Sequence, residues 1–323
     1  MNTTAPLTDD EVGILLSSAV HAPSMHNTQP WRFEIQGPVI DVHLDKDRML
    51  PAEDPAGRMV RIGLGAAAFN LRVAAAMLGH ESTFAVEPDP ADPSVVARIF
   101  LSESRSPVPE LSALYREIGR RHTYRGPMGD LPIPPMVISR LSGAAKTEGA
   151  ELHRLDEDAV RRLARILRQA DDLDLHDEDR LHERARWIGG KRADDGVPDA
   201  ALGPLPTGPA MVRDLAAGYA VEGREETDFE ARPVIAVLST DDEDEAAWVR
   251  AGLALQRVLL TATSSILAVS FLNQALEHQE PRRQVRELIG GAWPQMILRI
   301  GYPAEAETAT GRTPWRDALD RWF

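Results

Sequence analysis

In its first half the chain carries the run Val60-Arg61-Ile62-Gly63-Leu64, and 189 residues later it carries Val249-Arg250-Ala251-Gly252-Leu253. Each copy lies in a long apolar stretch that predicts a helix. Two other runs repeat on either side in the same order, 38–42 at 233–237 and 93–99 at 294–300. The three matches label strand, helix and strand in both halves, so the sequence predicts two copies of one α+β unit. The alternative is chance similarity among common apolar residues.

Helices and short β-rich runs alternate along the rest of the chain. Apolar periodicity favours helices at 8–19, 59–78, 108–121, 136–147, 157–169 and 178–187. Strands are predicted at 31–35, 39–44, 82–86, 95–101 and 150–155. A tandem copy often takes the place of a homodimer. We therefore expect the long helices around Gly63 and Gly252 to pack together across a pseudo-twofold axis, where their small residues permit close approach.

The composition excludes several classes of protein. The 323 residues include no cysteine, which excludes disulfides, thiolate zinc sites and a cysteine nucleophile. A formal charge of −14 disfavours nucleic acid and membrane surfaces as partners. The uncharged run 258–276 contains several hydroxyl and amide side chains, so it favours a buried helix leading into a strand over a membrane span. The polar residues 1–10 show no targeting segment, and we expect a cytoplasmic protein.

The stretch from about 156 to 231 differs from the rest, because two helices are followed by a segment rich in glycine and proline. A long segment of this kind within a compact domain is a functional loop, such as a lid, or is disordered. We favour a lid, since several apolar side chains could anchor it. These are Trp187, Leu202, Leu205, Met211, Leu215 and Tyr219.

Some short motifs have simpler structural explanations. The run 63–68 matches the dinucleotide pattern G-x-G-x-x-A, but no convincing strand precedes it, and we interpret it as helix packing. His176 and His182 lie in an acidic surface stretch, which argues against a metal site. The acids at 241–245 are interpreted as a solvated loop that begins a helix.

Two segments could carry chemistry. The loop Ala22-Pro23-Ser24-Met25-His26-Asn27-Thr28-Gln29-Pro30-Trp31 is dense in small and amide-bearing residues, which can present backbone N–H and C=O groups to a flat heterocycle. The run Arg120-Arg121-His122-Thr123-Tyr124-Arg125 offers three guanidiniums and a hydroxyl as a phosphate clamp. The structural alternatives are a rigid turn with side-chain caps for the first segment and a basic surface patch for the second.

Residues 22–33 resemble the A-P-S-x-x-N-x-Q-P-W-x-F signature of the nitroreductase family of flavin enzymes, with every specified letter present. The run 120–125 is similar to that family's R-R-S-x-R phosphate motif, with His122-Thr123 in place of the usual arrangement around serine. Residues 251–312 resemble its long interface helix, last strand and C-terminal arginine. The outline is most similar to the duplicated Acg-type branch, in which one chain mimics the usual homodimer and a long insertion covers the flavin.

The resemblance implies an internally duplicated α+β nitroreductase fold. Residues 1–107 would form the first half, and 108–323 the second half with a lid-like insertion at about 170–230. It also implies an FMN site. The phosphate would be held by Arg121, Thr123, Arg125 and Arg312. The ring edge would contact Pro23, Ser24 and Met25, with Asn27 bracing the loop.

Two further parts of the FMN site follow from the resemblance. Residues Phe271, Leu272 and Asn273 lie where the family places a backbone N–H near flavin N5, although the usual Glu-Gly is missing there. Gln256 is a candidate for the ribityl chain. The first half has the loop but no arginine before Arg32, and the second half has the clamp but no second loop. One complete FMN site per chain is therefore expected.

The resemblance implies an oxidoreductase that takes hydride from NAD(P)H and reduces a nitroaromatic, a quinone or a similar acceptor. The flavin would carry the chemistry, with no catalytic side chain and no metal. The alternative is a flavin-sequestering or storage protein whose insertion blocks nicotinamide access; a specialised dehydrogenase is a third possibility. Acidic residues of the insertion favour restricted access, since they would repel NAD(P)H phosphates: Asp177, Glu178, Asp179, Glu183, Asp194 and Asp195. We expect a monomer, because the duplication already buries the dimer interface.

Overall fold

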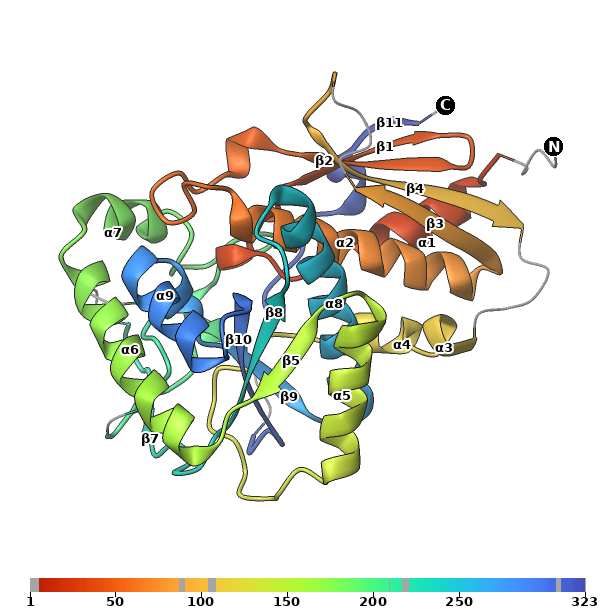
Figure 1. Ribbon diagram of the computed structural model, residues 1–323. Coiled ribbons are helices and arrows are strands. Elements are labelled where there is room, and N and C mark those ends of the chain that lie inside the picture. The colour runs from red at the N-terminus through yellow and green to blue at the C-terminus, as the bar shows by residue number, and fades with distance from the viewer. Residues whose placement is uncertain are drawn as a thin grey trace.

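Two sheets enclose a central pair of helices, α2 (Arg58–Met77) and α8 (Glu245–Ser264) (Figure 1). The computed structural model describes residues 6–86, 91–103, 109–208, 210–216, 221–305 and 309–322. Helix α2 packs against strands of one sheet and α8 against strands of the other, so the helix pair lies between them. The predicted α+β architecture is confirmed.

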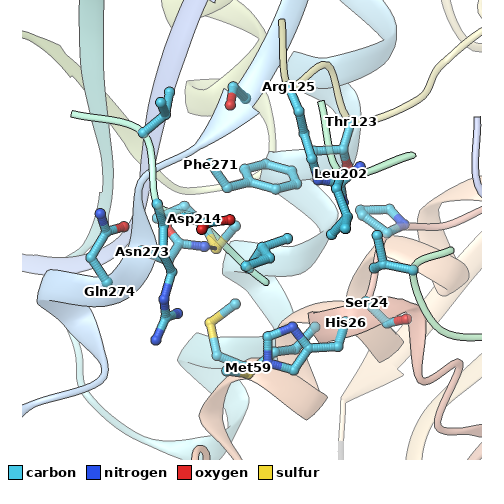
Figure 2. A pocket seen from close by; sticks show the side chains of 18 of the residues that line it. Ser24, His26, Met59, Thr123, Arg125, Leu202, Asp214, Phe271, Asn273 and Gln274 are labelled. Carbon is cyan, nitrogen blue, oxygen red and sulfur yellow. Dashed lines mark hydrogen bonds between the residues drawn. The ribbon is translucent and has the colours of Figure 1, made fainter. Parts of the chain in front are cut away.

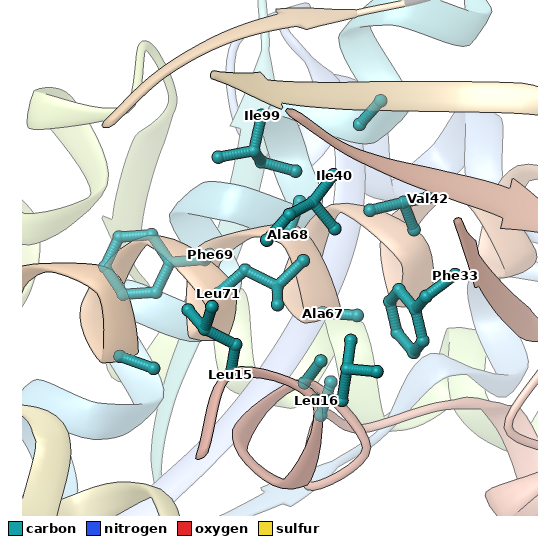
Figure 3. Packing of buried hydrophobic residues seen from close by; sticks show 14 of the residues in the cluster. Leu15, Leu16, Phe33, Ile40, Val42, Ala67, Ala68, Phe69, Leu71 and Ile99 are labelled. Carbon is teal, nitrogen blue, oxygen red and sulfur yellow. The ribbon is translucent and has the colours of Figure 1, made fainter. Parts of the chain in front are cut away.

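The first sheet has the strand order β11-β1-β2-β4-β3. These strands span Leu319–Trp322, Trp31–Gln36, Val39–Leu44, Val95–Glu103 and His80–Val86. All neighbours are antiparallel except β11, which is parallel to β1. Alternate residues such as Phe33, Ile40 and Ile99 pack with α2 and α1 (Asp9–Ala19) in one core cluster (Figure 3). The period of two buries one face of this sheet.

The second sheet has the strand order β5-β8-β10-β9 and is entirely antiparallel. Its strands span Glu151–Arg154, Val234–Thr240, Trp293–Gly301 and Ala268–Phe271. Ile235 and Val237 of β8 pack with α6 (Glu157–Leu175) and α9 (Gln279–Leu288). Ala236 and Leu238 pack with α8 and α5 (Pro135–Thr147). Because both faces of the sheet are covered, β8 is a continuous apolar run and does not alternate with polar residues.

The two halves repeat one arrangement of elements. The first runs α1, β1, β2, α2, β3, β4, and the second contains α5, β5, β8, α8, β9, β10 in the same sequence. The strand orders β1-β2-β4-β3 and β5-β8-β10-β9 correspond one to one. This shared topology supports the internal duplication that the sequence matches predict.

Helices α2 and α8 touch backbone to backbone where they cross. A methyl group added at Gly65 would lie 2.1 Å from the carbonyl oxygen of Val249 and 3.0 Å from the Cα of Gly252. One added at Gly252 would lie 2.1 Å from the carbonyl oxygen of Ile62. The structure therefore explains Gly252 of the repeated run together with Gly65, which lies just beyond its first copy: both permit a crossing that any side chain would block.

The structure corrects some of the predicted elements. The helix predicted at 108–121 is two short helices, α3 (Pro109–Ser112) and α4 (Tyr115–Ile118), because Leu111 and Ile118 each pack separately into the first core cluster. Helix α6 extends beyond residue 169, and α9 and β11 were not predicted. Strand β11 returns the end of the chain to the first sheet. The predicted boundary at residue 107 lies outside the described residues.

One helix in the described part of the chain, α2, is long and apolar enough to cross a membrane by length and composition. Its most apolar window is 94% buried inside the protein, which is typical of a core helix. The uncharged run 258–276, noted from the sequence, forms the end of α8 and then β9, as expected.

Candidate functional site

A cavity lies between the two halves and the insertion. Its wall contains residues 23–26 and part of α2 from the first half, Thr123, Arg125 and β9 residues from the second, and insertion residues between 197 and 224 (Figure 2). The residues proposed from the sequence that line it are Pro23, Ser24, Met25, Thr123, Arg125, Phe271 and Asn273.

The loop before β1 has an unusual backbone. His26, Asn27 and Gln29 adopt positive φ angles of 48°, 56° and 51°, a region that side-chain-bearing residues rarely occupy. The Oγ of Ser24 accepts a hydrogen bond from the Gln29 N–H at 2.9 Å. The loop also lies close to α2, since a methyl group at Gly63 would be 3.4 Å from the Pro23 carbonyl oxygen. Gly63 thus faces this loop and lines the cavity, whereas the helix packing expected for the run 63–68 is made by Gly65 against Gly252.

The amide side chains of this loop form hydrogen bonds with other segments of the chain and do not line the cavity. Asn27 Nδ2 donates to the carbonyl oxygens of Gly196 (3.0 Å) and Gly311 (3.1 Å), and its Oδ1 accepts from Arg312. Gln29 bridges Asp194 and Thr313 in the same way. Asn27 therefore braces the loop and does not line the cavity. The residues ahead of it, 23–26, form the wall.

Three guanidiniums lie beside the loop. Arg121 Nη2 donates to the His21 carbonyl oxygen at 3.1 Å, but its buried Nε and Nη1 have no partner, nor does the Nε of Arg312. In the described ranges no carboxylate pairs with Arg121 or Arg312. Burial, together with the charges of Arg312 and Arg125, lowers the pKa of Arg121 to about 9. Buried cations with unpaired N–H groups are costly, so this cluster is suited to an anion.

The four residues of the predicted clamp fall into two groups. Thr123 and Arg125 line the cavity, whereas Arg121 and Arg312 lie outside its wall. Burial and the charge of Arg125 lower the pKa of Arg312 to about 10, so the three arginines are near enough to repel one another. Arg125 Nη1 donates to the Ala201 carbonyl oxygen at 3.0 Å, which connects the clamp to the insertion.

Two residues proposed for the cofactor lie elsewhere. The side chain of Leu272 is buried in the core between the second sheet, α6 and α9, and its N–H donates to the Ile297 carbonyl oxygen at 3.0 Å. Gln256 donates to Asn70 Oδ1 at 2.7 Å between α8 and α2. Both are corrections to the predicted contacts: Leu272 belongs to the core, and Gln256 joins the two central helices.

Described residues of the insertion form part of the cavity wall. It contains α7 (Glu178–Ala185) and the short pair β6 (Leu205–Pro206) and β7 (Glu226–Thr227). Among the predicted anchors, Leu202 and Leu215 line the cavity, Met211 packs beside α6, and Tyr219 lies outside the described residues. The described residues thus favour the lid interpretation over disorder.

The six acidic residues named from the sequence do not line the cavity. Glu183 is buried and accepts hydrogen bonds from the N–H groups of Ala52 and Glu53. Asp177 caps α7, and Asp195 pairs with Arg48. The one acid of the described insertion that lines the cavity is Asp214, whose carboxylate pairs with Arg224. The expectation that the six acids repel NAD(P)H phosphates is therefore corrected, because they lie outside the cavity wall.

A buried ion-pair network joins the insertion to both halves, and the sequence analysis missed it. Its members are the carboxylates Glu53, Asp174 and Glu277, the arginines Arg180, Arg184 and Arg213, and the histidines His26 and His278. The alternating charges of α6 and α7 are typical of a solvated helix face. No sequence signal indicated that they face inward.

Comparison with known proteins establishes the family. No protein-family model matches the chain. The Mycobacterium tuberculosis protein named "Putative NAD(P)H nitroreductase acg" is 31% identical over 320 residues, covering 98% of this chain and 96% of that protein. "Putative NAD(P)H nitroreductase Rv3131" from the same organism is 33% identical over 322 residues, covering 98% of this chain and 92% of that protein.

The chain belongs to the nitroreductase family. Among solved structures, a nitroreductase with bound FMN from Desulfitobacterium hafniense overlays with a TM-score of 0.41 at 14% identity, covering 63% of this chain and 95% of that chain. A BluB-like flavoprotein from Clostridium difficile gives 0.42 at 12% identity, covering 63% and 96%. At these values it is the sequence relationship that places the chain among the nitroreductases.

Proposed function

We propose that the protein is an FMN-dependent oxidoreductase that takes electrons from NAD(P)H and reduces a small acceptor, a nitroaromatic or a quinone. One observation carries the proposal: the buried guanidiniums of Arg121 and Arg312 have N–H groups without partners, and both sense the charge of Arg125, which lines the cavity. The relatives named as NAD(P)H nitroreductases support the nicotinamide donor.

The residues present fit FMN. Charge-assisted hydrogen bonds from Arg121, Arg125 and Arg312 suit a phosphate, and apolar side chains such as Met59 and Phe271 suit a planar ring. When bound, FMN would supply the centre that accepts and returns electrons. The chain's own residues would bind the phosphate, orient the ring and limit the entry of water.

The purified protein is expected to hold one FMN per chain. The clamp comes from the second half and the 23–26 loop from the first, and neither is repeated in the other half. Acid release of the flavin followed by chromatography measures the ratio. Two flavins per chain would contradict the single-site arrangement, and a protein that binds none would overturn the proposed function.

The function is tested by mixing the FMN-loaded protein with NADPH in a stopped-flow instrument. Bleaching of the flavin, followed by its reoxidation when a quinone is added, is the expected result. A flavin that dithionite bleaches and NADPH does not would favour the second candidate, a flavin-sequestering protein. That candidate is supported by the insertion, which lines the cavity and is held by buried ion pairs to both halves.

We expect the protein to be a monomer in solution. Helices α2 and α8 already pack together within one chain, which would satisfy the interface that a non-duplicated relative would form between subunits. Light scattering at micromolar concentration should give 35.5 kDa. A dimeric mass would contradict this prediction without affecting the FMN site.

A further inference from the structure

One pocket residue has an arrangement that binding of a cofactor phosphate or ring does not explain. His26 lines the cavity and is 8% exposed. Its backbone is left-handed, with φ 48° and ψ 22°, a conformation that residues with a side chain rarely adopt. Such strain persists where the surrounding structure enforces it, often at functional sites. Figure 2 shows the imidazole among the side chains that line the cavity.

The imidazole is held by a buried carboxylate. His26 Nε2 lies 2.6 Å from Glu53 Oε2, and the Glu53 side chain is completely buried. The other oxygen, Oε1, accepts from Arg184 Nε at 2.8 Å. Burial on its own raises the pKa of Glu53, but the charges of His26, Arg184 and Arg213 hold it far below its usual range. These contacts favour the carboxylate form of Glu53, which can balance an imidazolium.

This contact sets the roles of the two ring nitrogens. A carboxylate accepts only, so the Nε2 of His26 carries the proton in the hydrogen bond with Glu53. Nδ1 then has a lone pair in the neutral ring and a transferable proton in the charged ring. Among the described residues no group hydrogen-bonds to Nδ1, and it is the nitrogen available to a molecule in the cavity.

We propose that His26 is the proton donor to the electron-accepting substrate, with Glu53 as its positioning residue. The inference rests on the proposed function. A quinone becomes a hydroquinone by gaining two electrons and two protons. NAD(P)H supplies, by way of the cofactor, both electrons and one proton as hydride. The second proton comes from His26: its Nδ1–H bond breaks, an O–H bond forms on the acceptor, and the ring regains a proton from solvent.

The remaining charged groups around this pair belong to the ion-pair network. Asp174 and Glu277 contact the arginines that hold Glu53, and His278 contacts Asp174. Arg184 and Arg180 lie on α7 of the insertion. The insertion therefore does more than cover the cavity, since it fixes the carboxylate that orients His26.

Two electron acceptors distinguish the loss of a proton donor from a general loss of electron transfer in the variants. Quinone reduction consumes a proton, whereas ferricyanide takes an electron and no proton. The FMN-loaded protein is reduced anaerobically with stoichiometric dithionite and mixed with 1,4-benzoquinone or ferricyanide in a stopped-flow instrument. His26→Asn is the first variant, because asparagine tolerates the left-handed backbone, and His26→Gln is the second. His153→Gln on β5, where His153 contacts Ser239, is the matched control.

In both His26 variants we expect benzoquinone reduction to slow by about a hundredfold or more, with ferricyanide reduction and FMN content close to wild type. Unchanged benzoquinone rates, or equal slowing with both acceptors, would overturn the proposal. If reduced wild-type protein passes electrons to neither acceptor, the proposed function fails and this inference fails with it. Suppose instead that wild type reduces both acceptors while the His26 variants show no selective slowing with benzoquinone. That result would refute the role of His26 as proton donor and leave the proposed function intact.

The positioning role of Glu53 has its own spectroscopic test. Nitrogen-15 NMR of the imidazoles, assigned with His26→Asn, is expected to place a proton on Nε2 of His26, in the hydrogen bond with Glu53. Glu53→Gln should shift the tautomer signal of His26 and leave that of His153 unchanged. A mixture of tautomers at His26 in the wild-type protein would contradict the assigned role.

Discussion

Gly252→Ala is expected to destabilise the protein by about 3 kcal/mol, at the upper end of the usual overpacking range. The added methyl group would lie 2.1 Å from the Ile62 carbonyl oxygen and 2.9 Å from the Ala66 nitrogen. These are backbone atoms of α2 and cannot rotate aside as a flexible side chain would. Helices α2 and α8 would have to separate along the whole contact between the halves. Denaturant unfolding of wild type and variant measures the difference in free energy.

Gly143→Ala is the matched control, since Gly143 also lies within a helix, α5, and a methyl group there meets no atom within 4 Å. It should stabilise the protein by up to about 1 kcal/mol through helix propensity alone. Gly65→Ala should resemble Gly252→Ala, and the double variant should cost less than the sum, because one separation of the helices relieves both clashes. A Gly252→Ala protein as stable as wild type would refute the close crossing.

Replacing Arg121 with methionine is expected to weaken FMN binding by about ten- to a hundredfold, because a hydrogen bond to a charged group contributes roughly 1.5–3 kcal/mol. Methionine preserves the apolar stem that packs in this buried position. The FMN-free variant should be at least as stable as FMN-free wild type, since it no longer buries a cation with unpaired N–H groups. Flavin fluorescence titration gives the affinity, and thermal unfolding gives the stability.

Arg161→Ala is the control for Arg121, because Arg161 lies on α6 with 65% of its side chain exposed and pairs with Asp158 and Glu157. It should leave FMN affinity unchanged. Equal affinities in the two variants would remove Arg121 from the phosphate site. Loss of stability in FMN-free Arg121→Met would show that the hydrogen bond to the His21 carbonyl oxygen outweighs the cost of burying the cation.

Much of the fold could be predicted because its strongest signals are local. The apolar periods of α2 and α8 and the alternation of β1 and β2 reflect the faces that they bury. The single helix predicted at 108–121 was wrong, because Leu111 and Ile118 reach the core from two separate short helices. Strand β11 could not be predicted, since its pairing with β1 depends on residues almost 300 positions away.

The candidate site likewise contains residues that local sequence motifs reveal and residues that only long-range contacts reveal. The resemblance to the family signature pointed to Pro23, Ser24 and Met25, and all three line the cavity. Leu272 and Gln256 were misplaced, since position along the chain does not reveal which side of an element faces the cavity. No sequence motif indicated that Glu53 belongs to the site. Its contacts with His26 and Arg184 form only when the chain folds, since those residues are distant in sequence.

Residues 311–322 contact the insertion, the loop before β1 and strand β1 itself. The tail passes so near the insertion that a methyl group at Gly311 would lie 1.6 Å from the Ala193 carbonyl oxygen. Arg312 and Thr313 then bind the side chains of Asn27 and Gln29 before β11 joins β1. Arg312 is also one of the three clustered arginines, so this single segment connects the arginine cluster with the first sheet. We therefore expect a chain shortened before Arg312 to lose a cation of the cluster, the brace of the loop before β1 and the edge strand of the sheet together.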